Sequence, residues 1–166
     1  MKRHWPNLIN PPLTYAASSK EARANCKWAP PPPGWHKLNF DGAARGNPGV
    51  SGIGCIINDE DGRWVAKFSS PLPPVSNNVA ELEALEKGLQ LCRKLGLPRV
   101  FIEGDSQIIL NAIRQKKTPN WVLNSKLQEV LLIMSNFEDI FISHIYREGN
   151  SLADELANKG ADGESI

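Results

Sequence analysis

The sequence predicts an α/β fold, a five-stranded mixed sheet whose first three strands pair antiparallel and whose later strands run parallel, with helices on both faces. Three closely spaced strand patterns between residues 37 and 69 are joined by turn sequences, which is typical of an antiparallel meander. After residue 77, helical and strand patterns alternate, as in a parallel extension of a sheet. A chain of 166 residues with 41% hydrophobic content suits one domain with a full core.

Charge and cysteine content narrow the class of protein. The formal net charge of +1 excludes the broad positive field of a strong non-specific nucleic-acid binder. Cys26, Cys55 and Cys92 are widely spaced and odd in number, which favours free thiols in a reducing compartment. The sequence has no long apolar run and no secretory segment. We therefore expect a soluble, intracellular monomer without a membrane partner, in the nucleus or cytoplasm, with an organelle as the alternative.

Residues 1–33 differ in composition from the rest of the chain. They are rich in proline, ending in four consecutive prolines at 30–33, and show no sustained apolar period. This composition predicts a flexible leader that ends in a short polyproline II segment. Its basic residues leave an organelle transit peptide open, and a linker from a larger polypeptide is the other interpretation. We expect the folded domain to span residues 34–162 and to be followed by a short tail at 163–166.

The first strand of that domain is predicted at residues 37–41, directly before a glycine-rich turn. Alternate side chains of a strand share a face, so Leu38 and Phe40 should point into the core. Asp41 lies on the opposite, polar face and should be carried to the end of the strand. Taken alone, this stretch favours a simple hairpin turn after an edge strand, so its role depends on the other elements of the chain.

The next elements complete the meander and lead into a helix. Residues 52–58 and 64–69 read as strands around a turn, and the prolines at 71, 73 and 74 are expected to end the pairing. Asn77 and Asn78 occupy positions where helix caps are expected, before a helix from Val79 to about residue 95. Glu81, in its first turn, should lie beside the apolar stripe, near the rim.

The second half repeats the pattern of a strand that ends on an acid. Residues 99–105 read as a strand ending on Asp105, followed by a helix over about 106–114. A loop leads to Trp121, which we expect to cap the core, and to a second amphipathic helix with apolar positions from 123 to 134. A last strand at 140–146 and a short helix from Ser151, carrying Asp154, close the domain.

Four acids can converge on one edge of this sheet. In open sheets of this class ligands bind beyond the strand ends, where Asp41 and Asp105 are predicted, and two helices supply Glu81 and Asp154. Without a cation, their mutual repulsion would amount to several pK units. Oxygen-only ligands select Mg²⁺ or Mn²⁺. Two such ions, roughly 3.5–4 Å apart, support phosphodiester hydrolysis, so the acids predict a metal-dependent nuclease.

Several short motifs occur in a recognisable order. They are Asp41-Gly42-Ala43-Ala44-Arg45-Gly46-Asn47-Pro48-Gly49, Asn77-Asn78-Val79-Ala80-Glu81, Asp105-Ser106-Gln107 and Asp154-Glu155-Leu156-Ala157. His144 stands ten positions before Asp154 with Asn150 between them. Over residues 35–160 this order resembles type 1 ribonucleases H and their mobile histidine loop. The lead into Asp41 and the turn after His144 look most like the plant branch, found at the ends of retrotransposon-derived reverse transcriptase polyproteins.

The resemblance implies an endonuclease that hydrolyses the RNA strand of RNA/DNA hybrids and leaves 5′-phosphomonoesters. It implies two Mg²⁺ ions, replaceable by Mn²⁺, held by Asp41, Glu81, Asp105 and Asp154, with His144 in proton transfer or product release. Amide side chains both donate and accept, so they suit the reading of a 2′-hydroxyl. The implied substrate-binding residues are Gly42, Ala44, Arg45, Asn47, Asn77, Asn78, Gln107 and Asn150.

Two other functions are alternatives to the nuclease: a non-catalytic binding module and a 3′ exonuclease. No long basic insertion stands between Asp105 and His144, so duplex binding should be weak and salt-sensitive, with Lys116, Lys117 and Arg147 as the remaining candidates for phosphate contacts. The main alternative is a catalytically weak or inactive nucleic-acid-binding module of retroelement origin. The presence of all four acids argues against it, but a loop shift of about 1 Å would be enough to lower the rate greatly. A 3′ exonuclease would begin with Asp-x-Glu, whereas alanine stands two positions after Asp41 here.

Overall fold

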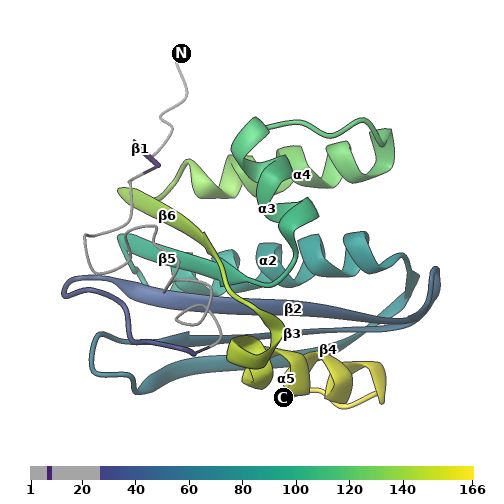
Figure 1. Cartoon of the computed structure of the whole chain (residues 1–166), viewed down its shortest axis with the longest axis horizontal. Helices are drawn as coiled ribbons and strands as arrows, with labels where there is room; N and C mark the ends of the chain where they lie inside the picture. Colours follow the sequence, from purple (N-terminus) through teal and green to yellow (C-terminus); the bar gives the residue numbers. More distant parts are fainter. Residues whose placement is uncertain (1–6, 9–26) are drawn as a thin grey trace.

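The computed structural model describes residues 7–8 and 27–166 and is built on one sheet with the strand order β1-β6-β5-β2-β3-β4 (Figure 1). The strands are β1 Asn7–Leu8, β2 His36–Gly46, β3 Gly49–Asn58, β4 Trp64–Val75, β5 Arg99–Gly104 and β6 Asp139–His144. The helices are α2 Asn77–Lys94, α3 Gln107–Gln115, α4 Trp121–Met134 and α5 Ser151–Ala161, with a 3₁₀ turn, η2, at Arg147–Asn150.

The expected mixed sheet is confirmed, with one addition at its edge. β2, β3 and β4 pair antiparallel, and β2, β5 and β6 run parallel. The addition is β1, whose two residues pair parallel with Asp139 and Ile140 of β6. The rest of the predicted leader, apart from residues 27–33, lies outside the described residues, as does Cys26.

β2 is longer than the sequence predicts, and Asp41 lies in its middle instead of at its end. The strand continues to Gly46, because residues 42–46 pair with β3 across a tight hairpin. Its parallel pairing with β5, however, stops at Asn39, opposite Glu103. Asp41 therefore lies just beyond the parallel part of the sheet, which is the position that matters for a site at that edge.

β4 also runs further than expected. The prolines at 71, 73 and 74 were predicted to end the pairing near residue 69, yet the strand continues to Val75. β4 is an edge strand, so only one of its sides has a neighbour. Proline is tolerated there, because the missing N–H need not serve a second strand.

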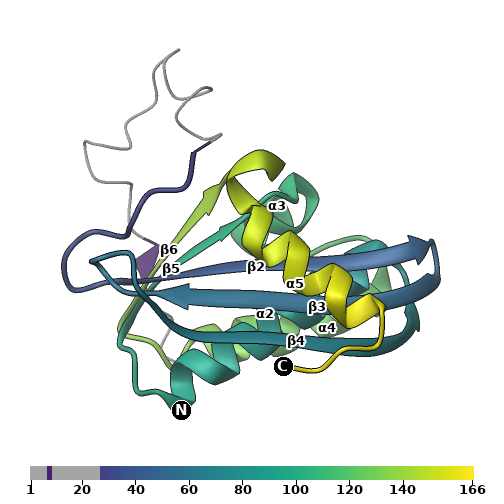
Figure 2. The same cartoon turned by 90° about the horizontal axis from the view of Figure 1, so that it is seen from below.

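Helices cover both faces of the sheet, as predicted. α2 packs on β2 and β3 with α4 behind it, whereas α5 crosses β2, β3 and β4 on the opposite face (Figure 2). On the α5 side, β3 presents Gly52 and Gly54, where any Cβ would overlap the α5 backbone near Ala157 and Ala161. The two glycines therefore let α5 lie directly on the strand.

The start of α2 differs from the prediction. Ser76 is the N-cap, and its Oγ accepts a hydrogen bond from the Val79 N–H at 3.3 Å. The helix consequently begins at Asn77, so the side chains of Asn77 and Asn78 are not used as caps. Serine fits the N-cap position as well as asparagine does, so the helix begins two residues earlier than predicted.

The core lies between the sheet and α2, α3 and α4. Leu38 and Phe40 are buried in it as predicted, together with the free cysteines Cys55 and Cys92. Trp121 was expected to cap this core, but it is 81% exposed at the first residue of α4. Among the helices of the described residues, none combines the length and the apolar character needed to cross a lipid bilayer.

Candidate metal centre

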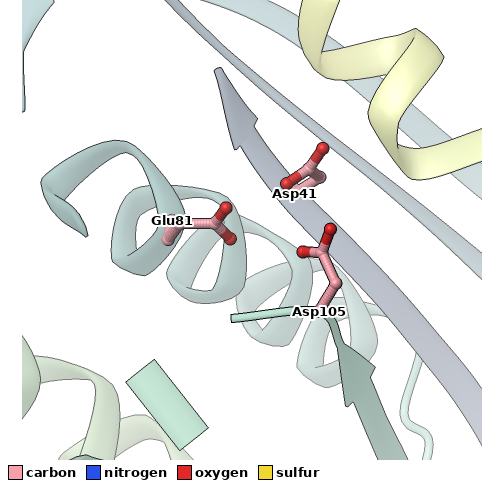
Figure 3. A group of neighbouring side chains, drawn as sticks. All are labelled: Asp41, Glu81 and Asp105. Atoms are coloured by element: carbon pink, nitrogen blue, oxygen red, sulfur yellow. The ribbon is translucent and has the colours of Figure 1, made fainter. Parts of the chain in front are cut away.

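Three carboxylates from three elements meet at one end of the parallel part of the sheet. Asp41 comes from β2, Glu81 from α2 and Asp105 from the residue after β5 (Figure 3). Each offers a carboxylate oxygen such that these oxygens all lie within 4.8 Å of one another. Such a set of hard oxygen donors can coordinate a small divalent cation.

Sheet register explains why the two aspartates meet. Asn39 and Glu103 are the last paired residues of β2 and β5, and each aspartate stands two positions after one of them. Because the strands are parallel and side chains alternate, both carboxylates lie on the same face at the same level. The pairing of strand residues that lie 64 positions apart in the sequence, such as Asn39 and Glu103, thus creates the acidic pair.

A single glycine explains why Glu81 joins them. A Cβ at Gly42 would overlap the backbone of Ala80 and Glu81. Because residue 42 has no side chain, α2 approaches β2 directly beside Asp41 and brings Glu81 with it. Glu81 was expected near a rim, but it is only 4% exposed, and this close approach is the reason.

Burial places the carboxylates under electrostatic strain. Burial, with Asp105 and Asp154 contributing repulsion, raises the pKa of Asp41 to about 7. Burial and the neighbouring Asp41 raise the pKa of Glu81 well above its ordinary value, and burial also raises the pKa of Asp105. Within the described part of the chain, Glu81 Oε2 has no hydrogen-bond partner. A buried, unpartnered acceptor among acids fits a cation ligand.

Asp154 lies at the same site but outside the tight group of three. It reaches from the first turn of α5 and, after burial, is one of the neighbouring acids that raise the pKa of Asp41. Its Oδ1 is 3.5 Å from Arg147 Nη2, so a guanidinium faces the acid that is furthest from the others. The four predicted acids therefore gather around one opening, three of them closely.

The acids line a polar cavity of about 350 Å³. Its lining residues are Asp41, Gly42, Ala43, Ala44, Arg45, Asn77, Glu81, Asp105, Ser106, Arg147, Asp154 and Asn158. Of the substrate-binding residues predicted from the resemblance, Gly42, Ala44, Arg45 and Asn77 are in this lining. Arg45 also pairs with Asp162, at 2.6 Å between Nη1 and Oδ1.

The other predicted substrate contacts lie around the opening or away from it. Asn47 Oδ1 accepts a hydrogen bond from the Asn77 N–H at 3.1 Å, so Asn47 supports the start of α2. Gln107 is exposed in the first turn of α3, and Asn78 is half-buried beside Asn77. Asn150 is 2% exposed, and its amide bonds to Asn39 and Phe40 instead of lining the cavity.

His144 ends β6, beside the loop that carries Asp105. Its Nε2 is 3.2 Å from the Asp105 carbonyl oxygen, and its ring packs edge-on against Tyr146, with centroids 5.2 Å apart. His144 is not part of the cavity lining. In this arrangement, it contacts the backbone of an acid in the site.

Ser106 and Asn158 line the cavity but were not singled out from the sequence. Ser106 is the N-cap of α3, with Oγ 3.3 Å from the Ile109 N–H. Asn158 lies four residues after Asp154 on the same face of α5, and its Nδ2 donates to the Asp154 carbonyl at 3.0 Å. Helical spacing from Asp154 was the available signal for Asn158.

The sequence around this site matches a known protein family. The family described as reverse transcriptase-like matches residues 39–160, a span that contains all four acids. The chain belongs to this ribonuclease H-type family. An Arabidopsis thaliana protein named for ribonuclease H is 35% identical over 131 residues, which cover 79% of this chain and 21% of that protein. The ribonuclease HI of Halobacterium salinarum is 33% identical over 128 residues, covering 74% and 62%.

Solved structures of ribonuclease H enzymes have the same fold. The Halobacterium salinarum RNase H1 structure aligns with a TM-score of 0.74 at 32% identity, covering 77% of this chain and 98% of that chain. LC11-RNase H1 in complex with an RNA/DNA hybrid aligns with a TM-score of 0.73 at 33% identity, covering 76% and 96%. The ribonuclease H-like domain described here spans only about a fifth of the Arabidopsis protein's length.

Proposed function

We propose that this ribonuclease H-like domain is a metal-dependent endonuclease that hydrolyses the RNA strand of RNA/DNA hybrids. The observation that carries the proposal is the group of Asp41, Glu81 and Asp105, whose carboxylate oxygens lie within 4.8 Å of one another, with Glu81 Oε2 unpartnered among the described residues. Burying three acids together is unfavourable unless a cation neutralises them. The names of similar enzymes and the hybrid-bound structure of one of them support the substrate.

The acids would hold two divalent cations, Mg²⁺ with Mn²⁺ as a substitute. Asp41, Glu81 and Asp105 form the closer group, and Asp154 completes the set from α5. When bound, the ions would supply an activated water and stabilise the leaving oxygen, giving a 5′-phosphate on the product. Because all four acids belong to one chain, a single copy is sufficient for the site.

Polar groups at the opening would orient the hybrid. Arg45 and Arg147 stand at the cavity that contains the acids and would contact phosphates. Asn77, whose side chain is not used as a helix cap, would donate to and accept from a 2′-hydroxyl in the minor groove. Asn78 in α2 and Gln107 in α3 are proposed to bind the minor groove beside Asn77. Asn47 is proposed to hold Asn77 in place through its hydrogen bond to the Asn77 N–H. Arg147 would exchange its contact with Asp154 for a phosphate.

His144 is proposed to act in proton transfer or product release next to Asp105. Its ring contacts the Asp105 carbonyl and Tyr146, which places it beside this acid. Histidine titrates near neutral pH, which suits a proton carrier. We also propose a plant origin, which the similar Arabidopsis protein supports, and the retroelement ancestry that the motifs suggest.

The test is cleavage of a labelled RNA/DNA hybrid in Mg²⁺, in Mn²⁺ and in chelator, beside single-stranded RNA and duplex DNA. Metal-dependent cutting of the RNA strand alone, lost in Asp105→Asn, is the expected result. Binding of the hybrid without cutting in either metal would refute the nuclease and favour the binding module.

A further inference from the structure

A second polar cluster lies buried on the α5 side of the sheet, next to the acids but separate from their cavity. It consists of Lys37 and Asn39 of β2, Glu103 of β5, Asn150 of η2 and the indole of Trp28. Lys37 is fully buried, with its Nζ 3.2 Å from Glu103 Oε1. Burying an ion pair is weak support for stability, so the cluster calls for another explanation.

The hydrogen bonds of this cluster form a directed chain. Trp28 Nε1 donates to Asn39 Oδ1 at 2.9 Å, and Asn39 Nδ2 donates to Glu103 Oε2 at 2.9 Å and to Asn150 Oδ1 at 3.0 Å. An indole N–H can only donate, so it holds the oxygen of the Asn39 amide towards itself. The amide nitrogen of Asn39 is thereby directed at Glu103 and Asn150.

The chain ends at the catalytic strand. Asn150 Nδ2 donates to the Phe40 carbonyl at 3.0 Å, and Phe40 directly precedes Asp41. Asn150 is also the last residue of η2, between Arg147 and the α5 turn that carries Asp154. One buried amide thus joins the start of α5 to the backbone beside Asp41, and so fixes where Asp154 stands relative to the other acids.

The upstream segment closes the cluster. The Ala29 carbonyl accepts from Lys37 Nζ at 2.6 Å, and the Lys37 ammonium lies 5.3 Å from the Trp28 ring centroid and 4.5 Å from that of Phe101. Trp28 also packs 3.7 Å from the Cβ position of Gly62, in the turn before β4. Trp28 therefore donates a hydrogen bond to the cluster, and its ring packs over the Lys37 ammonium. Residues 28–29 do this although they precede the expected start of the domain at residue 34.

We propose that Trp28 is a positioning residue of the nuclease site, acting through Asn39 and Asn150 to set the start of α5 and thus Asp154. The proposal rests on the nuclease function proposed above. It assigns residues 28–33 to the working domain. Loss of the indole frees the Asn39 amide to rotate, so Asn150 loses a fixed partner and the acids lose their alignment. Misplacement by about 1 Å at a remote support is enough to lower a rate substantially.

The experiment compares Trp28→Phe and Trp28→Ala with Trp64→Ala in the full chain. Trp64 is a matched control, because its indole is 59% exposed on the edge strand β4 and contacts Lys67. Four quantities are measured: kcat and KM on a hybrid at a temperature well below the protein's melting temperature, the Mg²⁺ concentration at half-maximal rate, and amide hydrogen exchange over residues 147–154.

For Trp28→Ala we expect kcat to fall about tenfold with KM within about twofold of the original value, and the Mg²⁺ midpoint to rise. Exchange over residues 147–154 should accelerate, and Trp64→Ala should change none of these quantities. Trp28→Phe keeps an apolar ring but lacks the N–H donor, so it should show a smaller change in the same direction. An unchanged kcat in both Trp28 variants, with only the melting temperature lowered, would overturn the positioning role.

Failure of the Trp28 proposal can be told apart from misfolding of a variant and from failure of the proposed nuclease function. If Trp28→Ala does not fold, Trp28→Phe decides, because wild-type rates and exchange in that variant overturn the proposal. If the wild-type chain does not cut hybrids, the proposed function fails, yet the exchange comparison still decides whether Trp28 holds residues 147–154. Unchanged exchange in Trp28→Phe and faster exchange in Trp64→Ala would both count against the cluster as the support of α5.

Discussion

Replacing Asp41 by asparagine should stabilise the metal-free protein at pH 8, even though it removes an acid proposed to be essential. Burial raises the pKa of Asp41 from 3.8 to about 7. At about 1.36 kcal/mol per unit, holding this side chain ionised in the folded state costs about 4 kcal/mol. Because the asparagine amide is itself buried and polar, we expect about half of this amount, or about 2 kcal/mol, as a gain in the free energy of unfolding.

The size of this stability gain depends on pH. A carboxyl group whose folded pKa is raised contributes its full stability below its unfolded pKa of 3.8 and loses it as the pH rises towards about 7. The advantage of Asp41→Asn should therefore be small near pH 4 and grow until about pH 7. Urea denaturation of both proteins in chelator at pH 4.5, 6 and 8 measures it.

Magnesium provides the matched control for this prediction. The wild-type protein should gain stability when Mg²⁺ is added at pH 8, because a ligand that binds the folded state stabilises it, whereas the variant should gain much less. A stability difference between the two proteins that is the same at every pH would refute the reasoning, since an effect of charge must follow the titration of Asp41.

Three further substitutions test the rest of the site. Asp105→Asn should lower hybrid cleavage by at least about 100-fold with an unchanged circular dichroism spectrum, and full activity would remove Asp105 from the metal ligands. His144→Ala should lower kcat by about tenfold without altering the Mg²⁺ midpoint, and unchanged kinetics at saturating substrate would leave it a structural residue. Gly42→Ala should destabilise the fold by about 3 kcal/mol in urea, because its Cβ overlaps the α2 backbone, and a stability equal to wild type would contradict that contact.

Much of the fold follows from local pattern. The alternation of Leu38 and Phe40 with polar residues, and the apolar stripe of α2, correctly predict which faces are buried. The acids are predictable because each follows or interrupts a strongly patterned element. The full length of β2 is not predictable in this way, since residues 42–46 have weak strand propensity and are extended by their pairing with β3.

What the sequence could not predict depends on contacts between distant residues. Only the sheet order shows that β4 is an edge strand that tolerates proline. The burial of Glu81 depends on the close approach at Gly42, and no local pattern reveals it. The hydrogen bond between Asn39 and Asn150 joins residues 111 positions apart, so Asn150 looks like a surface turn residue in the sequence.

The register between β2 and β5 sets the relative positions of Asp41 and Asp105, and packing in the hydrophobic core holds that register. A slip of one residue between these strands would turn one aspartate to the opposite face of the sheet. A core side chain would then take its place where the acids meet. Such a slip is opposed by Leu38 and Ile102, which face each other and are fully buried. A repacking mutation at these positions would therefore separate the acids while every one of them remains in the sequence, and inspection of the motifs alone would not detect the change.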